Sequence, residues 1–101
     1  MKVRVKDEIM GPGNQPVVSE GGEKWTYRAV FGNVLMSELE ISGEEKYKRG
    51  KLAGRIFDEE EVELSLDEAK LLKDLVGKAF SASVVVPVWD LLDPPKEASD
   101  G

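Results

Sequence analysis

The stretch SLDEAKLLKDLVGKAF, from Ser65 to Phe80, decides the fold, because every local signal in it predicts the same helix. Ser65 can accept a hydrogen bond from a free N–H of the first turn, and Glu68 can reach back to the Ser65 N–H, which makes a capping box. Asp67 and Glu68 also place negative charge at the positive end of the helix dipole. With about 3.6 residues per turn, the helix has one charged side and one apolar side, which consists of Leu66, Ala69, Leu72, Leu75, Val76, Ala79 and Phe80. The sequence therefore predicts a core that receives this apolar side.

A second, shorter helix is predicted over residues 84–92, where apolar residues repeat at helical spacing. The residues at this spacing are Val85, Val88, Trp89 and Leu92. Ser83 is available as the N-cap, which would keep Pro87 within the first turn, where proline is tolerated. We expect this helix to return against residues 66–79 as an αα-hairpin, and the small polar residues 96–101 to form a disordered tail.

The amino-terminal segment KVRVKDEI, residues 2–9, alternates between polar and apolar residues as a half-buried strand does. The MGPGN that follows supplies turn residues, because glycine tolerates positive φ and proline fixes its own φ. Val17 and Val18 can then return as a second short strand. The sequence therefore predicts an amino-terminal β-hairpin, which must pack on another element because an isolated hairpin is only marginally stable.

The segment from Trp25 to Ile41 fits two structures. As a helix near 26–38, it spaces its apolar residues along one side and uses Thr26 as a cap. As a hairpin, it alternates along its first half and turns at Gly32-Asn33. Both interpretations place this aromatic-rich segment in the core.

A further helix is predicted over residues 43–56, where Ser42 and Glu45 form a second capping box. Gly50 and Gly54 weaken this helix, since each costs about 1 kcal/mol relative to alanine. The two glycines suit a close helix crossing, a broken helix or a strand over 51–57, and the sequence leaves these alternatives open.

The composition limits both the fold and the chemistry. A chain of 101 residues, 41% apolar and 34% charged, suits one small globular domain, which we place at residues 1–95. The chain has no cysteine and no histidine, which excludes disulfides, the usual zinc sites and the Ser-His-Asp and Cys-His catalytic arrangements. No paired catalytic residues are visible either, so we predict a protein that is not an enzyme and that uses no cofactor or metal.

Charge and hydropathy limit the partners. The net charge of −6 repels phosphate backbones and anionic membranes, so a nucleic-acid or membrane partner is not expected. The longest apolar run, from Val84 to Trp89, is far shorter than the roughly 20 residues that cross a bilayer. The amino terminus shows no signal peptide, so a cytoplasmic location is predicted.

An acidic run is the most conspicuous charge feature. Its carboxylates are those of Asp58, Glu59, Glu60, Glu61 and Glu63. They lack the alternate spacing and central glycine of an EF-hand loop, which argues against a calcium site. The main interpretation is a solvated loop, and the alternative is a mimic of DNA phosphates that inhibits a nucleic-acid enzyme.

A basic cluster precedes this run and consists of Lys46, Lys48, Arg49, Lys51 and Arg55. The main interpretation is an exposed helix side that acidic neighbours neutralise, and the alternative is the DNA contact of a small helical regulator. The predicted helix at 84–92 does not suit a recognition helix, because it has no Arg, Lys, Asn or Gln to read base edges. Its Val85, Val88, Trp89 and Leu92 are instead predicted to form a protein-binding surface wherever the chain itself leaves them exposed.

The order of these features, ending in VELSLDEAKLLKDLVGKAFSASVVVPVWDLLD, resembles small acidic proteins, commonly uncharacterised, of tailed bacteriophages and prophages. The resemblance is strongest over residues 62–93. It carries no functional-site motif, and it favours the helical interpretation of residues 26–38 and 42–57. It implies an origin in a phage or prophage and a location in the cytoplasm of the host bacterium.

We therefore predict an α+β fold, with an amino-terminal β-hairpin packed on about four short helices near 26–38, 43–56, 66–79 and 84–92. The predicted function is that of a non-enzymatic accessory protein that binds a phage or host protein, in virion assembly or in modulating a host component. A DNA mimic and a DNA-binding regulator are the alternatives. The sequence leaves the partner and the oligomeric state open.

Overall fold

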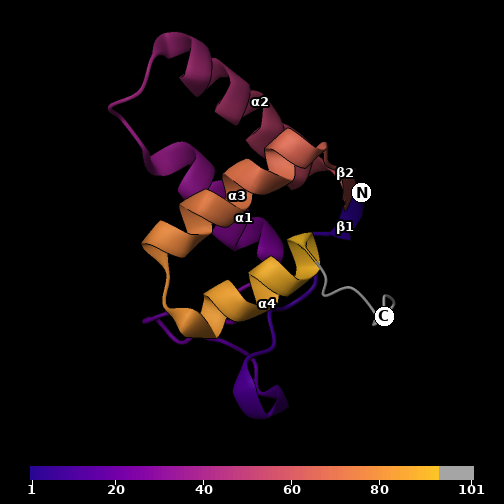
Figure 1. The fold of residues 1–101 in the computed structure, drawn as a ribbon. Coiled ribbons are helices and arrows are strands. Elements are labelled where there is room, and N and C mark those ends of the chain that lie inside the picture. The colour runs from indigo at the N-terminus through magenta and orange to yellow at the C-terminus, as the bar shows by residue number, and fades with distance from the viewer. Residues whose placement is uncertain (94–101) are drawn as a thin grey trace, which may run out of the picture.

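The computed structural model describes residues 1–93 of the 101-residue chain, and the predicted disordered tail at 96–101 lies outside the described residues. These residues form an α+β fold of four α-helices and a two-stranded antiparallel sheet, which confirms the predicted fold class (Figure 1). In chain order, the elements are β1 (Lys2–Arg4), the short 3₁₀ turn η1 (Pro12–Asn14), α1 (Tyr27–Ser37), α2 (Gly43–Asp58), β2 (Glu61–Glu63), α3 (Leu66–Ala79) and α4 (Ala82–Leu92).

Helix α3 forms as its sequence predicts. The Ser65 Oγ accepts the Glu68 N–H at 3.1 Å, and the Glu68 carboxylate accepts the Ser65 N–H at 2.9 Å, so the capping box is complete. Its buried residues are Ala69, Leu72 and Val76. Leu66 was predicted on the apolar side, but it is 88% exposed because it lies at the first helical position, at the edge of the packed side.

Helices α1 and α2 settle the two open interpretations in favour of helices. The Thr26 Oγ1 accepts the Ala29 N–H at 3.1 Å, and the Ser42 Oγ accepts the Glu45 N–H at 3.0 Å. The hairpin alternative for residues 25–41 and the strand alternative for 51–57 are therefore wrong. The second capping box is only half formed, because the Glu45 carboxylate accepts from Arg49 instead of the Ser42 N–H.

Helix α1 is the central element, since it packs against both α2 and α3. Gly32 allows α2 to approach closely: a Cβ at this position would lie 2.4 Å from Cζ of Phe57. Val30 and Phe31, next to it, are completely buried. The aromatic-rich segment therefore belongs to the core, as predicted.

Helix α4 packs along α3, which confirms the predicted αα-hairpin (Figure 1). It begins at Ala82, earlier than predicted, and its N-cap is Ser81, whose side chain makes no capping hydrogen bond. The prediction that Ser83 caps the helix is wrong, because the Ser81 carbonyl already accepts the N–H groups of Val84 and Val85 at 3.0 Å. The earlier start moves Pro87 into the second turn, where it supplies no N–H to the Ser83 carbonyl.

The amino-terminal segment reverses direction around η1, where the hairpin was predicted. The Gly11 N–H donates to the Gln15 carbonyl at 2.8 Å, and the Val17 N–H donates to the Ile9 carbonyl at 3.0 Å. Gly13 has φ +72°, a conformation that favours glycine. The reversal is thus confirmed, but its paired residues form isolated antiparallel bridges instead of the predicted second short strand.

Strand β1 has a partner that the sequence did not predict. It pairs with β2 and not with residues 17–18, with Val3 opposite Val62. Arg4 lies opposite Glu61, and the Val5 N–H extends the ladder to the Glu60 carbonyl at 3.1 Å. This pairing holds residues 60–63, which follow α2, against the amino-terminal strand.

One hydrophobic core cluster joins the strands and the four helices. Its most deeply buried side chains are Val3, Val5, Ile9, Val30, Phe31, Ile56, Val62, Leu64, Leu72, Val76 and Val88. Within residues 1–93, no polar or charged residue is buried, and no helix is long and apolar enough to span a bilayer.

Candidate functional site

The four residues predicted to bind a partner do not form one surface. Val88 is 0% exposed and Leu92 is 5% exposed, so both belong to the core, and Val85 is half-buried. The buried side of α4 is centred on Val84, Val88 and Leu92, which are spaced four residues apart. This rotation of the helix leaves Trp89 as the most exposed member of the predicted set, with 40% of its area exposed.

Trp89 is held in a defined position against α3. Its indole Nε1 donates to the Lys73 carbonyl at 3.1 Å, and the Lys73 Nζ lies 5.0 Å from the ring centroid. Gly77 leaves room for the ring, since a Cβ there would lie 3.2 Å from Cζ2 of Trp89. Lys73 is itself fixed by an ion pair of 2.9 Å with Asp93. The indole is therefore held in one position by contacts within the chain.

The outward side of α4 is unusually apolar for a helix at the surface. Val86 is 58% exposed, and Asp90 is the only charged residue between Ala82 and Leu92. Surface helices normally place charged residues on the side that faces water. Met10, which is 39% exposed, borders Val86 from the amino-terminal turn. Trp89 lies toward α3 and Met10 toward the amino-terminal turn, and we refer to Met10, Val86 and Trp89 as the α4 apolar surface.

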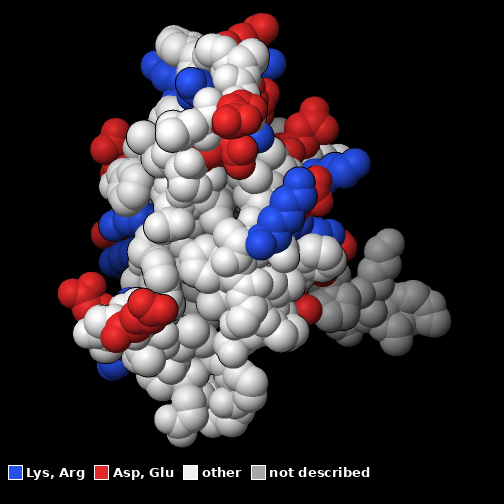
Figure 2. All heavy atoms as spheres, turned by 90° about the vertical axis from the view of Figure 1, so that its left-hand side faces the viewer, with Lys and Arg blue, Asp and Glu red and all other residues white. Residues whose placement is uncertain are grey.

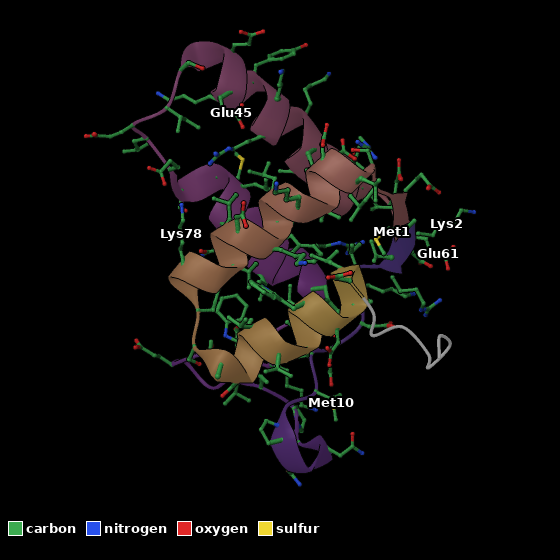
Figure 3. All side chains as sticks on the ribbon, in the orientation of Figure 1. Met1, Lys2, Met10, Glu45, Glu61 and Lys78 are labelled. Atoms are coloured by element: carbon green, nitrogen blue, oxygen red, sulfur yellow. The ribbon has the colours of Figure 1, made fainter. Side chains whose placement is uncertain are left out.

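A hollow of about 520 Å³ lies beside this surface, between α4 and the amino-terminal turn. It is lined by Met10, Gly11, Pro12, Ala82, Ser83, Val86, Pro87 and Asp90. Figure 3 places Met10 between α4 and η1. In Figure 2, the lowest part of the molecule, which holds η1, shows neither basic nor acidic side chains. We refer to this feature as the α4 hollow.

The acidic run stays exposed, as predicted, but it is not simply a loop, because Glu61 and Glu63 belong to β2. Three of its carboxylates face basic groups of the amino-terminal strand: Glu60 lies 3.2 Å from Lys6, Glu61 lies 3.9 Å from Arg4, and Glu63 lies 2.8 Å from the amino group of Met1. The labelled side chains of Met1, Lys2 and Glu61 lie together at this sheet in Figure 3.

Neutralisation also changes the titration of the exposed Glu63 carboxylate. The hydrogen bond and the charge of the Met1 amino group, with a smaller effect of Lys2, lower the pKa of Glu63 below 4.5. Asp58 ends α2, and Glu59 follows it as the C-cap. Because opposite charges alternate across the two strands, the five carboxylates do not present a surface of uniform negative charge. This arrangement weighs against the DNA-mimic alternative.

The basic cluster lies on α2, and both of its arginines have acidic partners. Arg49 lies 3.1 Å from Glu45, and Arg55 lies 3.0 Å from Glu68 at the start of α3. The side chain of Arg55 also donates to the Glu63 carbonyl. The lysines Lys46, Lys48 and Lys51 remain exposed. On the face that Figure 2 shows, basic and acidic side chains are interspersed at the upper end of the molecule, where α2 lies.

A groove of about 480 Å³ lies between α2 and α3, and it also mixes the two signs of charge. Lys48, Lys51 and Arg55 line one side, and Asp67 and Glu68 line the other. Within the described residues, no three acidic side chains come close enough to hold a metal ion. The α4 apolar surface and its hollow are therefore the features with the most distinctive chemistry.

No protein-family description matches this chain, and comparisons with curated proteins and with solved structures find no match either.

Proposed function

We propose that this chain is a non-enzymatic accessory protein of a phage or prophage, which acts in the cytoplasm of the host bacterium by binding another protein through the α4 apolar surface. The phage origin rests on the resemblance of residues 62–93. The binding role rests on one observation: the outward side of α4 exposes Val86 and Trp89 and carries only one charge.

The α4 apolar surface has the properties of a protein-binding site. Trp89 is among the residue types that dominate binding energies, and its ring is already fixed by Lys73 and Gly77. Binding a partner therefore costs less conformational entropy than it would if this side chain were mobile. Burying a side chain such as Val86 or Met10 contributes about 1.5–3 kcal/mol each when the burial is complete.

A pull-down with matched variants tests the proposal. Val86→Glu places a charge on the α4 apolar surface, and Met36→Glu places the same charge on an exposed methionine of α1, 63% exposed and outside that surface. The tagged proteins are incubated with a lysate of phage-infected bacteria, and the captured proteins are identified by mass spectrometry. We expect a protein that binds the wild type and Met36→Glu but not Val86→Glu. Equal capture by all three proteins would contradict a role for this surface.

A further inference from the structure

The outward side of α2 carries a line of aromatic residues and glycines that no other element of residues 1–93 covers. These residues are spaced alternately four and three positions apart, which places them on one side of the helix, and they are Gly43, Tyr47, Gly50, Gly54 and Phe57. Tyr47 is 67% exposed and Phe57 is 52% exposed. A Cβ built on any of the three glycines would meet no side chain within 4 Å. We refer to these five residues as the α2 stripe.

The mid-helix glycines of the α2 stripe have no role within the chain itself. Glycine in a helix interior lowers stability relative to alanine, so its presence calls for a close contact. Elsewhere in this protein a mid-helix glycine makes room for an aromatic ring of the next helix. A Cβ at Gly32 would lie 2.4 Å from the ring of Phe57, and a Cβ at Gly77 would lie 3.2 Å from the ring of Trp89. The open glycines of the α2 stripe therefore suit an aromatic ring from another molecule.

We propose that the α2 stripe is the contact between two copies of this chain, whose α2 helices cross in antiparallel directions about a two-fold axis at Gly50. Such a contact requires a surface that is complementary to itself. The axis exchanges positions that lie equally far before and after Gly50. Tyr47, three residues before the axis, then lies opposite Gly54, four residues after it. Phe57 and Gly43, each seven residues from the axis, also lie opposite one another. Each exposed ring thus meets a glycine of the second copy.

The spacing of the glycines also suits the approach of two helices. Gly50 and Gly54 are four residues apart, and ridges with this spacing interlock when helices cross at about −50°. Glycine at the crossing point lets the two backbones come close, and the helices diverge on either side. Tyr47 and Phe57 lie about 4 and 10 Å along the helix axis from Gly50, so their rings fill the widening space.

The charges beside the α2 stripe permit this contact. Lys46 flanks the stripe on one edge, and Glu44, Lys51 and Asp58 flank it on the other. The two-fold axis brings the two Lys51 side chains together, between the carboxylates of Glu44 and Asp58 from both copies. Counted over both edges, basic and acidic residues are equal in number. The contact surface therefore has no net charge, although the whole chain carries −6.

The size of the contact predicts a weak dimer. Aromatic side chains bury about 150–250 Å² each, so covering the exposed parts of Tyr47 and Phe57 buries about 240 Å² per copy. The neighbouring surface of α2 adds to this area, and the total falls in the class of weak interfaces below about 1,200 Å². We therefore expect a dimer that dissociates on dilution.

A dimer of this kind would present two copies of the α4 apolar surface. Figure 1 places α2 toward the upper end of the molecule and α4 toward the lower end, so the contact leaves α4 accessible. Two linked binding sites hold a repetitive or oligomeric partner more tightly than one site does. The inference extends the proposed function but does not depend on it.

Sedimentation velocity of the full-length chain, from micromolar to near-millimolar concentration, tests the dimer. We expect monomer at the lowest concentration and dimer at the highest. Gly50→Leu fills the crossing point and should keep the protein monomeric throughout. Position 50 is open in the monomer, so this variant should melt about 4–8 °C higher in dilute solution, because leucine favours a helix over glycine. Lys48→Leu, on the same helix but outside the stripe, is the control and should leave the dimer unchanged.

Single cysteines locate the axis. The chain has no cysteine, so a disulfide in a single-cysteine variant can only join two copies. A disulfide requires Cα atoms about 4.4–6.8 Å apart. Gly50→Cys should therefore form a covalent dimer under mild oxidation, because the axis brings the two residues together. Lys48→Cys, which faces away from the axis, should form much less.

The outcomes separate this inference from the proposed function. A wild type that stays monomeric throughout overturns the dimer, as does a dimer that persists in Gly50→Leu or equal cross-linking of the two cysteine variants. A dimer that Val86→Glu dissociates would place the contact on α4 and would also overturn it. A failed pull-down would contradict the binding role of α4 and would leave the α2 dimer in place.

Discussion

Helices α2 and α4 both bury one side in the core, and their outward sides differ sharply. The outward side of α2 exposes Tyr47 and Phe57, but it is densely charged, and part of that charge is paired within the helix, as between Arg49 and Glu45. The outward side of α4 carries Asp90 as its only charge and exposes Val86 and Trp89. The two helices therefore differ in the charge that accompanies their exposed apolar groups, and this difference is the basis of the binding role proposed for α4.

The inward sides of the two helices do not explain the difference. Each helix anchors itself with a small set of apolar residues at helical spacing. The buried residues are Leu52, Ala53 and Ile56 in α2, and Val84, Val88 and Leu92 in α4. A fold of this kind therefore does not need Val86 to be apolar, and the contrast between the two sides of α4 can be measured.

The largest effect is expected from placing the same charge on the two sides of α4. Val88→Glu puts a carboxylate into a position with 0% exposure, and it should destabilise the protein by about 4 kcal/mol or more, because a buried charge there has no partner. Val86→Glu, on the outward side, should change the free energy of unfolding by no more than about 0.5 kcal/mol. Urea denaturation followed by tryptophan fluorescence measures both values.

A similar loss of stability in both variants would contradict this comparison, because it would mean that Val86 also contributes to the core. The near-wild-type stability expected of Val86→Glu is also a control for the pull-down. It would show that the loss of a captured protein results from the altered surface and not from unfolding.

An intermediate effect on stability is expected at the N-cap residues of the two helices, Ser42 and Ser81. The Ser42 Oγ accepts an N–H at the start of α2, and Ser42→Ala should therefore cost about 0.5–2 kcal/mol. Ser81 caps α4 without a hydrogen bond from its side chain, so Ser81→Ala should have almost no effect. Thermal unfolding of the two variants, compared with the wild type, provides the measurement. Equal losses at the two positions would show that the Ser81 hydroxyl also caps its helix in solution.

The helices could be predicted from the sequence because their signals lie within a few residues of one another. Ser65 and Glu68 are three positions apart, and the capping serine and threonine of α1 and α2 act over the same distance. The sequence of residues 26–38 fits both a helix and a hairpin, and in the structure the Thr26 cap forms at the start of a helix. Local chemistry therefore predicted the number and order of the helices.

The pairing of β1 with β2 could not be predicted in this way. Val3 and Val62 are far apart in the sequence, and each strand is only three residues long. Opposite charges at Arg4 and Glu61 are consistent with the pairing, but such charges are common throughout the chain. The acidic run was consequently interpreted as a loop.

The candidate site was predicted only in part. Helical spacing identified Trp89, but it could not determine how α4 rotates against α3, and this rotation buries Val88 and Leu92. The α4 hollow was missed because its walls come from residues near both ends of the described chain, such as Met10 and Pro87. One signal was present in the sequence: the apolar run from Val84 to Trp89 is too continuous for a helix with one side in water.

The smallest effect concerns Tyr27, and it reports on the position of Asp90. Burial raises the pKa of Tyr27 above 10.0, and the charges of Asp7 and Asp90 raise it further. Asp90→Asn should therefore lower the pKa of Tyr27 without returning it to 10.0, because burial and Asp7 remain. Tyrosinate absorbance in a Tyr47→Phe background, where Tyr27 is the only tyrosine, follows this single group.

The same shift makes the stability depend on alkaline pH. Because the pKa of Tyr27 is higher in the folded state, its contribution to stability is fully present below pH 10.0 and is lost as the pH rises through the folded-state pKa. The loss should be smaller in Asp90→Asn and absent in Tyr27→Phe, and urea denaturation at a series of alkaline pH values measures it. A pKa of Tyr27 that does not respond to Asp90→Asn would contradict this prediction, because it would place the Asp90 carboxylate away from the tyrosine.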